Sequence, residues 1–188
     1  MAVLPIRIAG EPVLHEVAAP VTEFDDSLRE LVADMFDTMR EAPGVGLAAP
    51  QVGVGLRIFV YSWSDDDDVL HRGVAINPEL WLSPTPTGEA DDEEESEGCL
   101  SLPGERFALR RADRALLKAV DLEQNRFEIE ADGWLARIFQ HEYDHLDGVL
   151  YADRLDYPHF KAAAKVVRKK GWGVPGQSWM PGQDHPEG

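Results

Sequence analysis

The stretch QHEYDHLDG, residues 140–148, is the part of the sequence from which the fold can be worked out. It lies in a periodic apolar segment that predicts a helix over residues 133–147. His141 and His145 are four residues apart, so on a helix both rings lie on the same face, one turn apart. Two imidazoles at this spacing can bind one metal ion, with Glu142 placed to handle protons beside it.

The third metal ligand decides the class of site, because a hydrolytic metal site uses three protein ligands and one open position. The longer pattern HExxHxxGxxH fits up to its last position, where the chain has Tyr151 instead of histidine. A thermolysin-like site needs a later glutamate, and the only glutamate after Glu142 is Glu187 in the terminal tail. Both protease patterns therefore lack a ligand. Cys99, the only cysteine, is the remaining strong donor, and a thiolate with two imidazoles suits first-row metals.

The segments before and after this helix predict an α+β fold. Residues 25–41 have helical periodicity, with Asp25 and Asp26 as candidate N-caps. Strands are expected at 56–63, at 71–77 (ending at Asn77-Pro78) and in a run over 106–131, and a further helix is expected over 157–170. Because the strands follow one another without intervening helices, we expect antiparallel sheets packed around the HExxH helix, with a C-terminal helix. The expected domains are a single catalytic domain at 1–170 and a Gly/Pro-rich tail at 171–188.

Composition sets limits on location and partners. One cysteine excludes an internal disulfide framework, and the sequence has neither a secretory signal pattern nor an apolar run of membrane-spanning length, so we expect a cytoplasmic protein. A net charge of −17 argues against DNA as a partner. Residues 161–170 are the exception, because they carry five basic side chains and form either a solvated face or a docking element for an anionic partner. The acidic run at 89–97 is interpreted as a solvated loop.

Three short motifs occur in a fixed order: GVGLAAPQ at 44–51, EGCLS at 97–101 and HEYDH at 141–145. With these motifs the chain resembles the peptide deformylase family over roughly residues 7–160. The family consists of metallohydrolases that remove the N-terminal formyl group from the formylmethionine of nascent bacterial polypeptides. The resemblance implies one divalent metal ion, with Fe²⁺ expected and Zn²⁺, Ni²⁺ or Co²⁺ as alternatives in purified protein.

The resemblance also implies individual roles. The implied metal ligands are Cys99, His141 and His145. Glu142 is the implied general acid and base, and the Gln51 amide and the Leu100 backbone N–H are the implied oxyanion donors. The residues expected to contact substrate are Gly44, Val45, Gly46, Arg106 and Ile138.

Other residues keep two interpretations at this stage. Trp134 either borders the pocket for the substrate methionine or belongs to the core. Glu97 and Asp144 either orient the metal ligands or have surface or capping roles. The family resemblance implies ribosome docking through 161–170, although the tail that follows could cover this helix. The remaining histidines, without ligand spacing, are His15, His71, His159 and His185.

Two other functions compete with deformylation. A metalloendopeptidase would cleave internal peptide bonds and would keep its activity without Cys99. A binding module with a structural metal would need neither Glu142 nor Gln51, and the presence of both argues against it. We expect a monomer that acts on N-formylmethionyl peptides.

Overall fold

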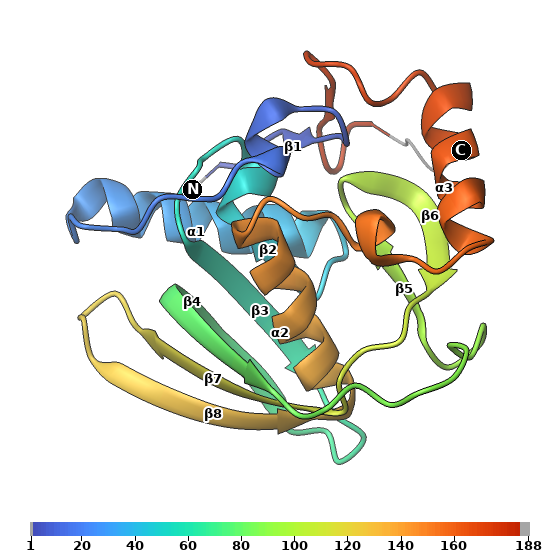
Figure 1. The fold of residues 1–188 in the computed structure, drawn as a ribbon. Helices are drawn as coiled ribbons and strands as arrows, with labels where there is room; N and C mark the ends of the chain where they lie inside the picture. Colours follow the sequence, from blue (N-terminus) through green and yellow to red (C-terminus); the bar gives the residue numbers. More distant parts are fainter. Residues whose placement is uncertain (1, 185–188) are drawn as a thin grey trace.

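The computed structural model describes residues 2–184. The α-helices are α1 (Asp26–Glu41), α2 (Gly133–Leu146) and α3 (His159–Lys169). The strands are β1 (Ile6–Arg7), β2 (Gly46–Ala48), β3 (Ile58–Ser64), β4 (Leu70–Leu82), β5 (Ser96–Cys99), β6 (Leu102–Ala108), β7 (Arg114–Val120), β8 (Arg126–Asp132) and β9 (Ser178–Trp179). The short 3-10 helices are η1 (Pro12–His15), η2 (Ala49–Val52) and η3 (Tyr151–Arg154). The predicted α+β class, with antiparallel sheets around the HExxH helix, is confirmed (Figure 1).

The first helix forms where its periodicity predicts. The Asp25 carboxylate accepts a hydrogen bond from the backbone N–H of Leu28 at 3.0 Å, which caps the N-terminus of α1. Its apolar face includes Leu28, Val32 and Met35, all of them buried. These side chains pack on one side of the main sheet and hold α1 against it.

The main sheet has five strands in the order β2-β3-β4-β7-β8, and every pairing in it is antiparallel. Side chains along β3 alternate between its two faces. Ile58 and Val60 pack with the residues of α1, whereas Phe59 and Tyr61 pack with those of α2. The sheet therefore lies between the two helices, with its edge strand β2 beside α2 (Figure 1).

Strand β4 continues past Asn77-Pro78, so the predicted end of this strand at that dipeptide is wrong. The pairing with β7 shifts between Ile76 and Glu79, and Asn77 has φ 49°. A bulge of this kind accommodates a proline that cannot donate to the ladder. The Asn77 amide bonds both the N–H and the carbonyl of Val21, at 2.8 and 2.9 Å, which stabilises the bulge.

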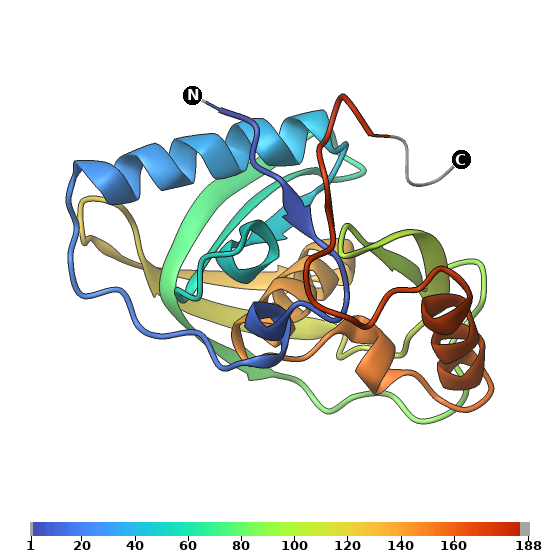
Figure 2. The same cartoon turned by 90° about the horizontal axis from the view of Figure 1, so that it is seen from above.

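Two smaller sheets, each of two strands, complete the fold. The β5-β6 hairpin carries Cys99, and β1 pairs with β9 from the C-terminal tail. Figure 2 shows the tail running back beside the N-terminal segment. Trp172 and Trp179 of the tail are buried in the apolar cluster that includes Cys99. Within residues 2–184, no helix has both the length and the apolar character needed to cross a membrane.

Candidate metal centre

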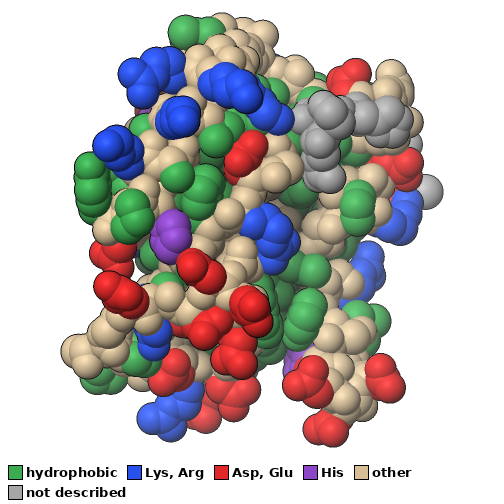
Figure 3. All heavy atoms as spheres, turned by 90° about the vertical axis from the view of Figure 1, so that its right-hand side faces the viewer, with side chains coloured by type: hydrophobic (Ala, Val, Ile, Leu, Met, Phe, Trp, Pro, Cys, Tyr) green, Lys and Arg blue, Asp and Glu red, His purple; other side chains and the backbone are tan. Residues whose placement is uncertain are grey.

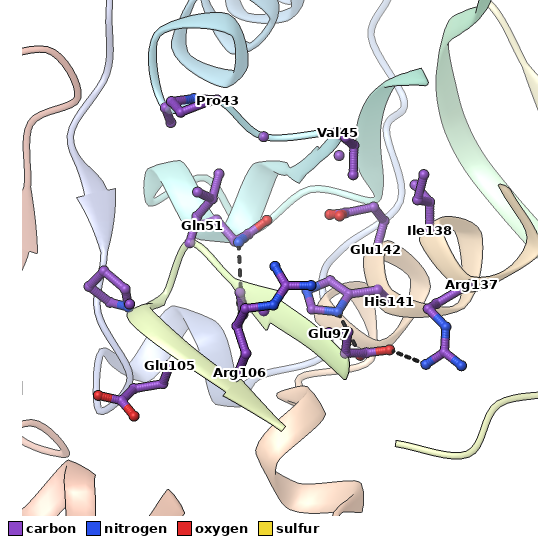
Figure 4. A pocket seen from close by; sticks show the side chains of 18 of the residues that line it. Pro43, Val45, Gln51, Glu97, Glu105, Arg106, Arg137, Ile138, His141 and Glu142 are labelled. Atoms are coloured by element: carbon purple, nitrogen blue, oxygen red, sulfur yellow. Dashed lines mark hydrogen bonds and ion pairs between the residues drawn. The ribbon is translucent and has the colours of Figure 1, made fainter. Parts of the chain in front are cut away.

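All the predicted site residues except the buried His145 line one cleft of about 390 Å³. Three parts of the chain form its walls: the segment from the turn before β2 to η2, the β5-β6 hairpin, and the N-terminal and central part of α2. Figure 4 shows Gln51, Glu142 and His141 directed toward the same space from these elements. The sequence-predicted residues that line the cleft are Gly44, Val45, Gly46, Gln51, Cys99, Leu100, Arg106, Ile138, His141 and Glu142.

The donor atoms of Cys99, His141 and His145 all lie within 4.8 Å of one another. His145 Nε2 lies 3.3 Å from Cys99 Sγ. The ring centroids of His141 and His145 are 5.0 Å apart. The i, i+4 spacing on α2 accounts for the two rings, and β5 brings the thiol to them. The three groups are of the types and at the distances that a first-row divalent ion requires.

The electrostatics of this cluster also suit a cation. Burial lowers the pKa of His145 well below its ordinary value, and the charge of His141 adds to this effect. The imidazole is therefore held in the neutral form that binds metals. Burial also acts to lower the pKa of His141, but the Cys99 thiolate and the Glu97 carboxylate outweigh it and raise that pKa well above its ordinary value. The same negative charge attracts a divalent ion.

Glu97 orients one of the rings. His141 Nδ1 donates to Glu97 Oε1 at 3.0 Å, which leaves the other ring nitrogen to face the cluster. The Glu97 side chain is buried, and burial alone would raise its pKa. The hydrogen bond from His141 and the charge of Arg111 outweigh burial, so that the pKa of Glu97 lies far below its ordinary value. Glu97 was expected either to orient a metal ligand or to have a surface or capping role. Its contact with the His141 ring supports the first interpretation.

Arg111 connects Glu97 with Asp144 in a buried ionic network. Its guanidinium donates to Glu97 Oε1 at 2.7 Å and to Asp144 Oδ2 at 2.6 Å. Arg137 donates to Glu97 Oε2 at 2.9 Å, and Arg154 forms a bidentate pair with Asp144. Asp144, which lies on α2, therefore contacts two arginines of this network, Arg111 and Arg154. These contacts connect α2 to the segments that carry the two arginines.

Glu142 lies on the cleft side of α2. Its carboxylate is buried, and within residues 2–184 its Oε2 has no hydrogen-bond partner. Burial raises the pKa of Glu142 to about 7. A buried carboxyl group with a free oxygen can take up and release a proton near neutral pH. The close approach of Gly46 holds it in place, because a Cβ at that position would lie 2.3 Å from Glu142 Oε1.

The Gln51 amide has a defined orientation. The backbone N–H of Ala48 donates to Gln51 Oε1 at 2.9 Å, which assigns the carbonyl end of the amide. The NH₂ group therefore points at the site, with Nε2 3.7 Å from Cys99 Sγ and 3.4 Å from Ser101 Oγ. A donor held this way is suited to an oxygen that develops negative charge.

The remaining cleft residues differ in their exposure to solvent. Val45 and Arg106 are exposed, and the Arg106 guanidinium donates to the Ser96 carbonyl at 2.7 Å. Ile138 is buried in the wall and packs with the core on the sheet side of α2. Trp134 is half-exposed at the same rim, where its ring lies beside that of Trp63. Trp134 thus borders the cleft and is not an interior core residue.

Within residues 2–184, the fold supplies neither protease pattern with its missing ligand. The Tyr151 ring lies 5.9 Å from His141, but its hydroxyl donates to the Glu105 carbonyl, away from the cluster. Glu187 and His185 lie outside the described residues. The three other histidines have separate partners: His15 accepts from the Gly10 N–H, and His71 and His159 contact Asp65 and Asp92.

Sequence reasoning missed the arginines of the network. Arg111 contacts carboxylates 14 and 33 positions away, and Arg137 contacts Glu97 across 40 positions. No local spacing marks such pairs. Arg137 lies on α2 between Trp134 and Ile138. It is buried, although a charged residue is normally expected at the surface.

Comparison with known proteins agrees with this geometry. Residues 3–161 match the family described as polypeptide deformylase. The chain is 50% identical to the peptide deformylase of Tropheryma whipplei, over 95% of this chain and 94% of that protein. The structure is similar to a Legionella pneumophila peptide deformylase, with a TM-score of 0.76 and 38% identity over 90% of this chain and 96% of the other. It is also similar to a class I type b peptide deformylase from Acinetobacter baumannii bound to Met-Ala-Ser, with a TM-score of 0.71 and 36% identity over 81% and 98%.

Proposed function

This chain belongs to the peptide deformylase family, whose metal-dependent members remove N-terminal formyl groups from nascent peptides, and we propose which of its residues carry out that reaction. The assigned metal ligands are Cys99, His141 and His145, with Glu142 as the general acid and base. The observation that carries the assignment is the meeting of these three donors beside a buried carboxylate, with Cys99, His141 and Glu142 lining one cleft.

The metal expected at this site is Fe²⁺. A thiolate with two imidazoles accepts several first-row ions, so Zn²⁺, Ni²⁺ or Co²⁺ can occupy it in purified protein. When bound, the ion supplies a Lewis acid that polarises the formyl group and activates water. The protein supports the ligand set through Glu97, which holds the His141 ring in one orientation.

Glu142 moves the protons. Deformylation is amide hydrolysis, so the attacking water loses a proton and the departing amine gains one. The Glu142 carboxylate accepts the first proton and delivers it to the amine nitrogen. General acid–base help of this kind contributes about 10²–10⁴ in rate. The Gly46 backbone against the carboxylate limits its movement, so that one oxygen remains directed into the cleft.

Gln51 and Leu100 stabilise the charge that forms on the formyl oxygen. The Gln51 NH₂ is already directed at the site by the bond between its carbonyl end and Ala48. Leu100 lies next to Cys99 on the opposite wall, where its backbone N–H is assigned as the second donor. One such donor is worth about 3 kcal/mol of barrier.

The substrate peptide binds in an extended form along Gly44, Val45 and Gly46. These residues lead into β2, which is the edge strand of the main sheet, so their outer side is available for strand addition. Main-chain pairing suits an enzyme that processes many different N-termini. Ile138 and Arg106 line the same cleft and contact the substrate side chains. The Acinetobacter relative was solved with Met-Ala-Ser, a peptide of the expected product class.

Helix α3 is the proposed ribosome-docking element. Its basic side chains, Lys161, Lys165, Arg168, Lys169 and Lys170, are all exposed. Figure 3 shows Lys and Arg gathered on one part of the face that carries α3, next to a region rich in Asp and Glu. The test is co-sedimentation with ribosomes at several salt concentrations. If neutralising Lys165, Arg168 and Lys169 together leaves association unchanged, the docking proposal is wrong.

The remaining assignments concern organisation. We infer one catalytic domain at 1–170 with a tail at 171–188. Residue 1 of the domain and residues 185–188 of the tail lie outside the described range. We also propose a monomer acting in the cytoplasm, where nascent peptides are made.

The function is tested with protein purified anaerobically with Fe²⁺ and assayed for release of formate from formyl-Met-Ala-Ser. The parent should hydrolyse it, and Glu142→Ala should lose about 10²–10⁴ of that rate while still binding metal. Full activity in the variant would exclude the assigned mechanism. Cleavage of internal peptide bonds that survives Cys99→Ala would instead indicate an endopeptidase.

A further inference from the structure

The C-terminal tail contacts the loop that carries the cysteine ligand. Strand β9 pairs with β1, with Trp179 opposite Ile6. The Trp179 side chain is buried with 8% exposure, and its indole Nε1–H donates to the Leu100 carbonyl at 2.9 Å. Trp179 lies 18 positions beyond residue 161, where the family match ends. It nevertheless bonds directly to Leu100, the residue next to Cys99.

The Leu100 carbonyl shares one peptide group with the Ser101 N–H, and a peptide group is planar. The Ser101 N–H donates to Cys99 Sγ at 3.4 Å. Trp179 therefore binds the carbonyl of a peptide group whose N–H is bonded to the cysteine sulfur. Rotation of this plane would weaken the bond to the sulfur and would also move the backbone of Leu100.

A second chain of bonds connects the same loop to the tail. The Ser101 carbonyl accepts from the Ala9 N–H at 2.9 Å, and the Ala9 carbonyl accepts from the Gly173 N–H at 2.7 Å. The segments are in close contact, since a Cβ on Gly10 would lie 2.4 Å from the Gly173 backbone. The Glu11 carboxylate accepts from the Gln177 N–H at 2.8 Å. These bonds fix the tail in place, so that Trp179 can act as a rigid support.

We propose that Trp179 is a positioning residue for the Cys99–Ser101 loop. Its indole N–H fixes the Leu100–Ser101 peptide, and this sets both the hydrogen bond to the thiolate and the direction of the Leu100 backbone. The effect on turnover rests on the proposed function of Leu100 as an oxyanion donor. The effect on the thiolate does not depend on that role.

The test compares Trp179→Phe with Trp172→Phe. Both change a buried tail tryptophan of the same apolar cluster, with exposures of 8% and 9%. Within the described range, the indole N–H of Trp172 makes no hydrogen bond, and its ring contacts Lys170 Nζ at 5.1 Å. The pair therefore separates loss of the donated hydrogen bond from loss of aromatic volume.

Each protein is loaded with Co²⁺, and three quantities are measured: the thiolate-to-cobalt absorption band, the rate of Co²⁺ loss to a chelator, and kcat for formyl-Met-Ala-Ser. For Trp179→Phe we expect a shifted band, faster Co²⁺ loss and a kcat lower by about 3- to 10-fold with KM nearly unchanged, the size of one hydrogen bond. Trp172→Phe should match the parent in all three.

The proposal is overturned if Trp179→Phe leaves the band and the rate of Co²⁺ loss unchanged, or if Trp172→Phe changes them equally. If the parent does not hydrolyse the formyl peptide, the proposed function fails, while the cobalt measurements still decide the role of Trp179. Should Trp179→Phe not fold, benzothienylalanine at position 179 keeps the ring shape and removes only the N–H, and the same criteria apply.

Discussion

Gly46 and Glu142 are in such close contact that a Cβ on Gly46 would lie 2.3 Å from Oε1 of the glutamate and 2.7 Å from its Cδ. Both the carboxyl carbon and an oxygen would have to move, and the group is buried. Gly46→Ala should therefore lower kcat by about 10²-fold by displacing the carboxylate, with metal content unchanged. Steady-state kinetics and metal analysis check this.

The control for Gly46→Ala is Gly55→Ala. A Cβ on Gly55 would meet only Val13 Cγ2, at an ordinary 3.8 Å, so this variant should be fully active. Equal activity in the two variants would show that the carboxylate has room to shift.

Gln51→Glu tests the donor assigned to the formyl oxygen. The glutamate keeps the acceptor for the Ala48 N–H but replaces the NH₂ that points at the site with an oxygen. We expect kcat to fall by about 10²–10³-fold, as for other lost oxyanion donors. The melting temperature should also fall, because a carboxyl group replaces a buried neutral amide. A kcat within twofold of the parent would remove Gln51 from the mechanism.

Arg111→Met and Arg154→Met form a matched pair for stability. Both arginines contact Asp144, but the Arg111 side chain is 6% exposed and that of Arg154 is 48% exposed. Losing Arg111 takes a buried cationic partner from both Glu97 and Asp144 and should cost about 3–5 kcal/mol in free energy of unfolding. The loss of Arg154 should cost below about 1 kcal/mol, because water screens the pair. Urea unfolding measures both, and similar values would contradict this account of the network.

Removing the metal should lower the melting temperature. An ion that binds only the folded chain stabilises it by about 3 kcal/mol when its free concentration is 100 times Kd. Treatment with a chelator should remove that stabilisation, and returning Co²⁺ should restore it. In Cys99→Ser the donor set is incomplete, so the shift on adding metal should nearly disappear. A shift as large as that of the parent would exclude Cys99 as a ligand.

Asp25 contributes an acid-sensitive cap to α1. The Ser27 hydroxyl, followed by the Leu28 N–H, lowers the pKa of Asp25 below its ordinary 3.8. Because the folded pKa is the lower one, the stabilisation is present above 3.8 and is lost as pH falls through the folded value. Asp25→Asn can still cap but cannot titrate, so its melting temperature should fall less than that of the parent between about pH 5 and 3.

Asp26→Asn is the charge control for this experiment. It removes the same charge one residue further on, and within residues 2–184 the Asp26 side chain makes no capping bond. Its melting temperature should follow that of the parent with pH. The capping explanation fails if the two variants respond to acid in the same way.

Local patterns predicted much of this molecule. The apolar periodicity of 25–41 and 133–147 located α1 and α2 to within a residue or so, and the His141–His145 spacing predicted two rings on one face. Such signals depend on neighbours within one helix, so they can be detected without the fold. The position of Cys99 beside these rings depends on β5, so no local periodicity predicts it; the donor chemistry of its thiol and the shared family motifs indicated it.

The features that could not be predicted depend on distant partners. Asn77-Pro78 normally ends a strand, but here the Asn77 amide bonds Val21, 56 positions away, and the strand continues through a bulge. The Arg111 network and the bond from Trp179 to Leu100 likewise join residues far apart in sequence. In each case a tertiary contact outweighs what the local composition indicates.

The pairing of β1 with β9 has a consequence for the order of folding. It joins Ile6 to Trp179, which is synthesised 173 positions later. While the chain is still being translated, β1 has no strand to pair with, and the carbonyl of Leu100 lacks its indole donor. The wall behind the cysteine is therefore completed only after β9 has been made.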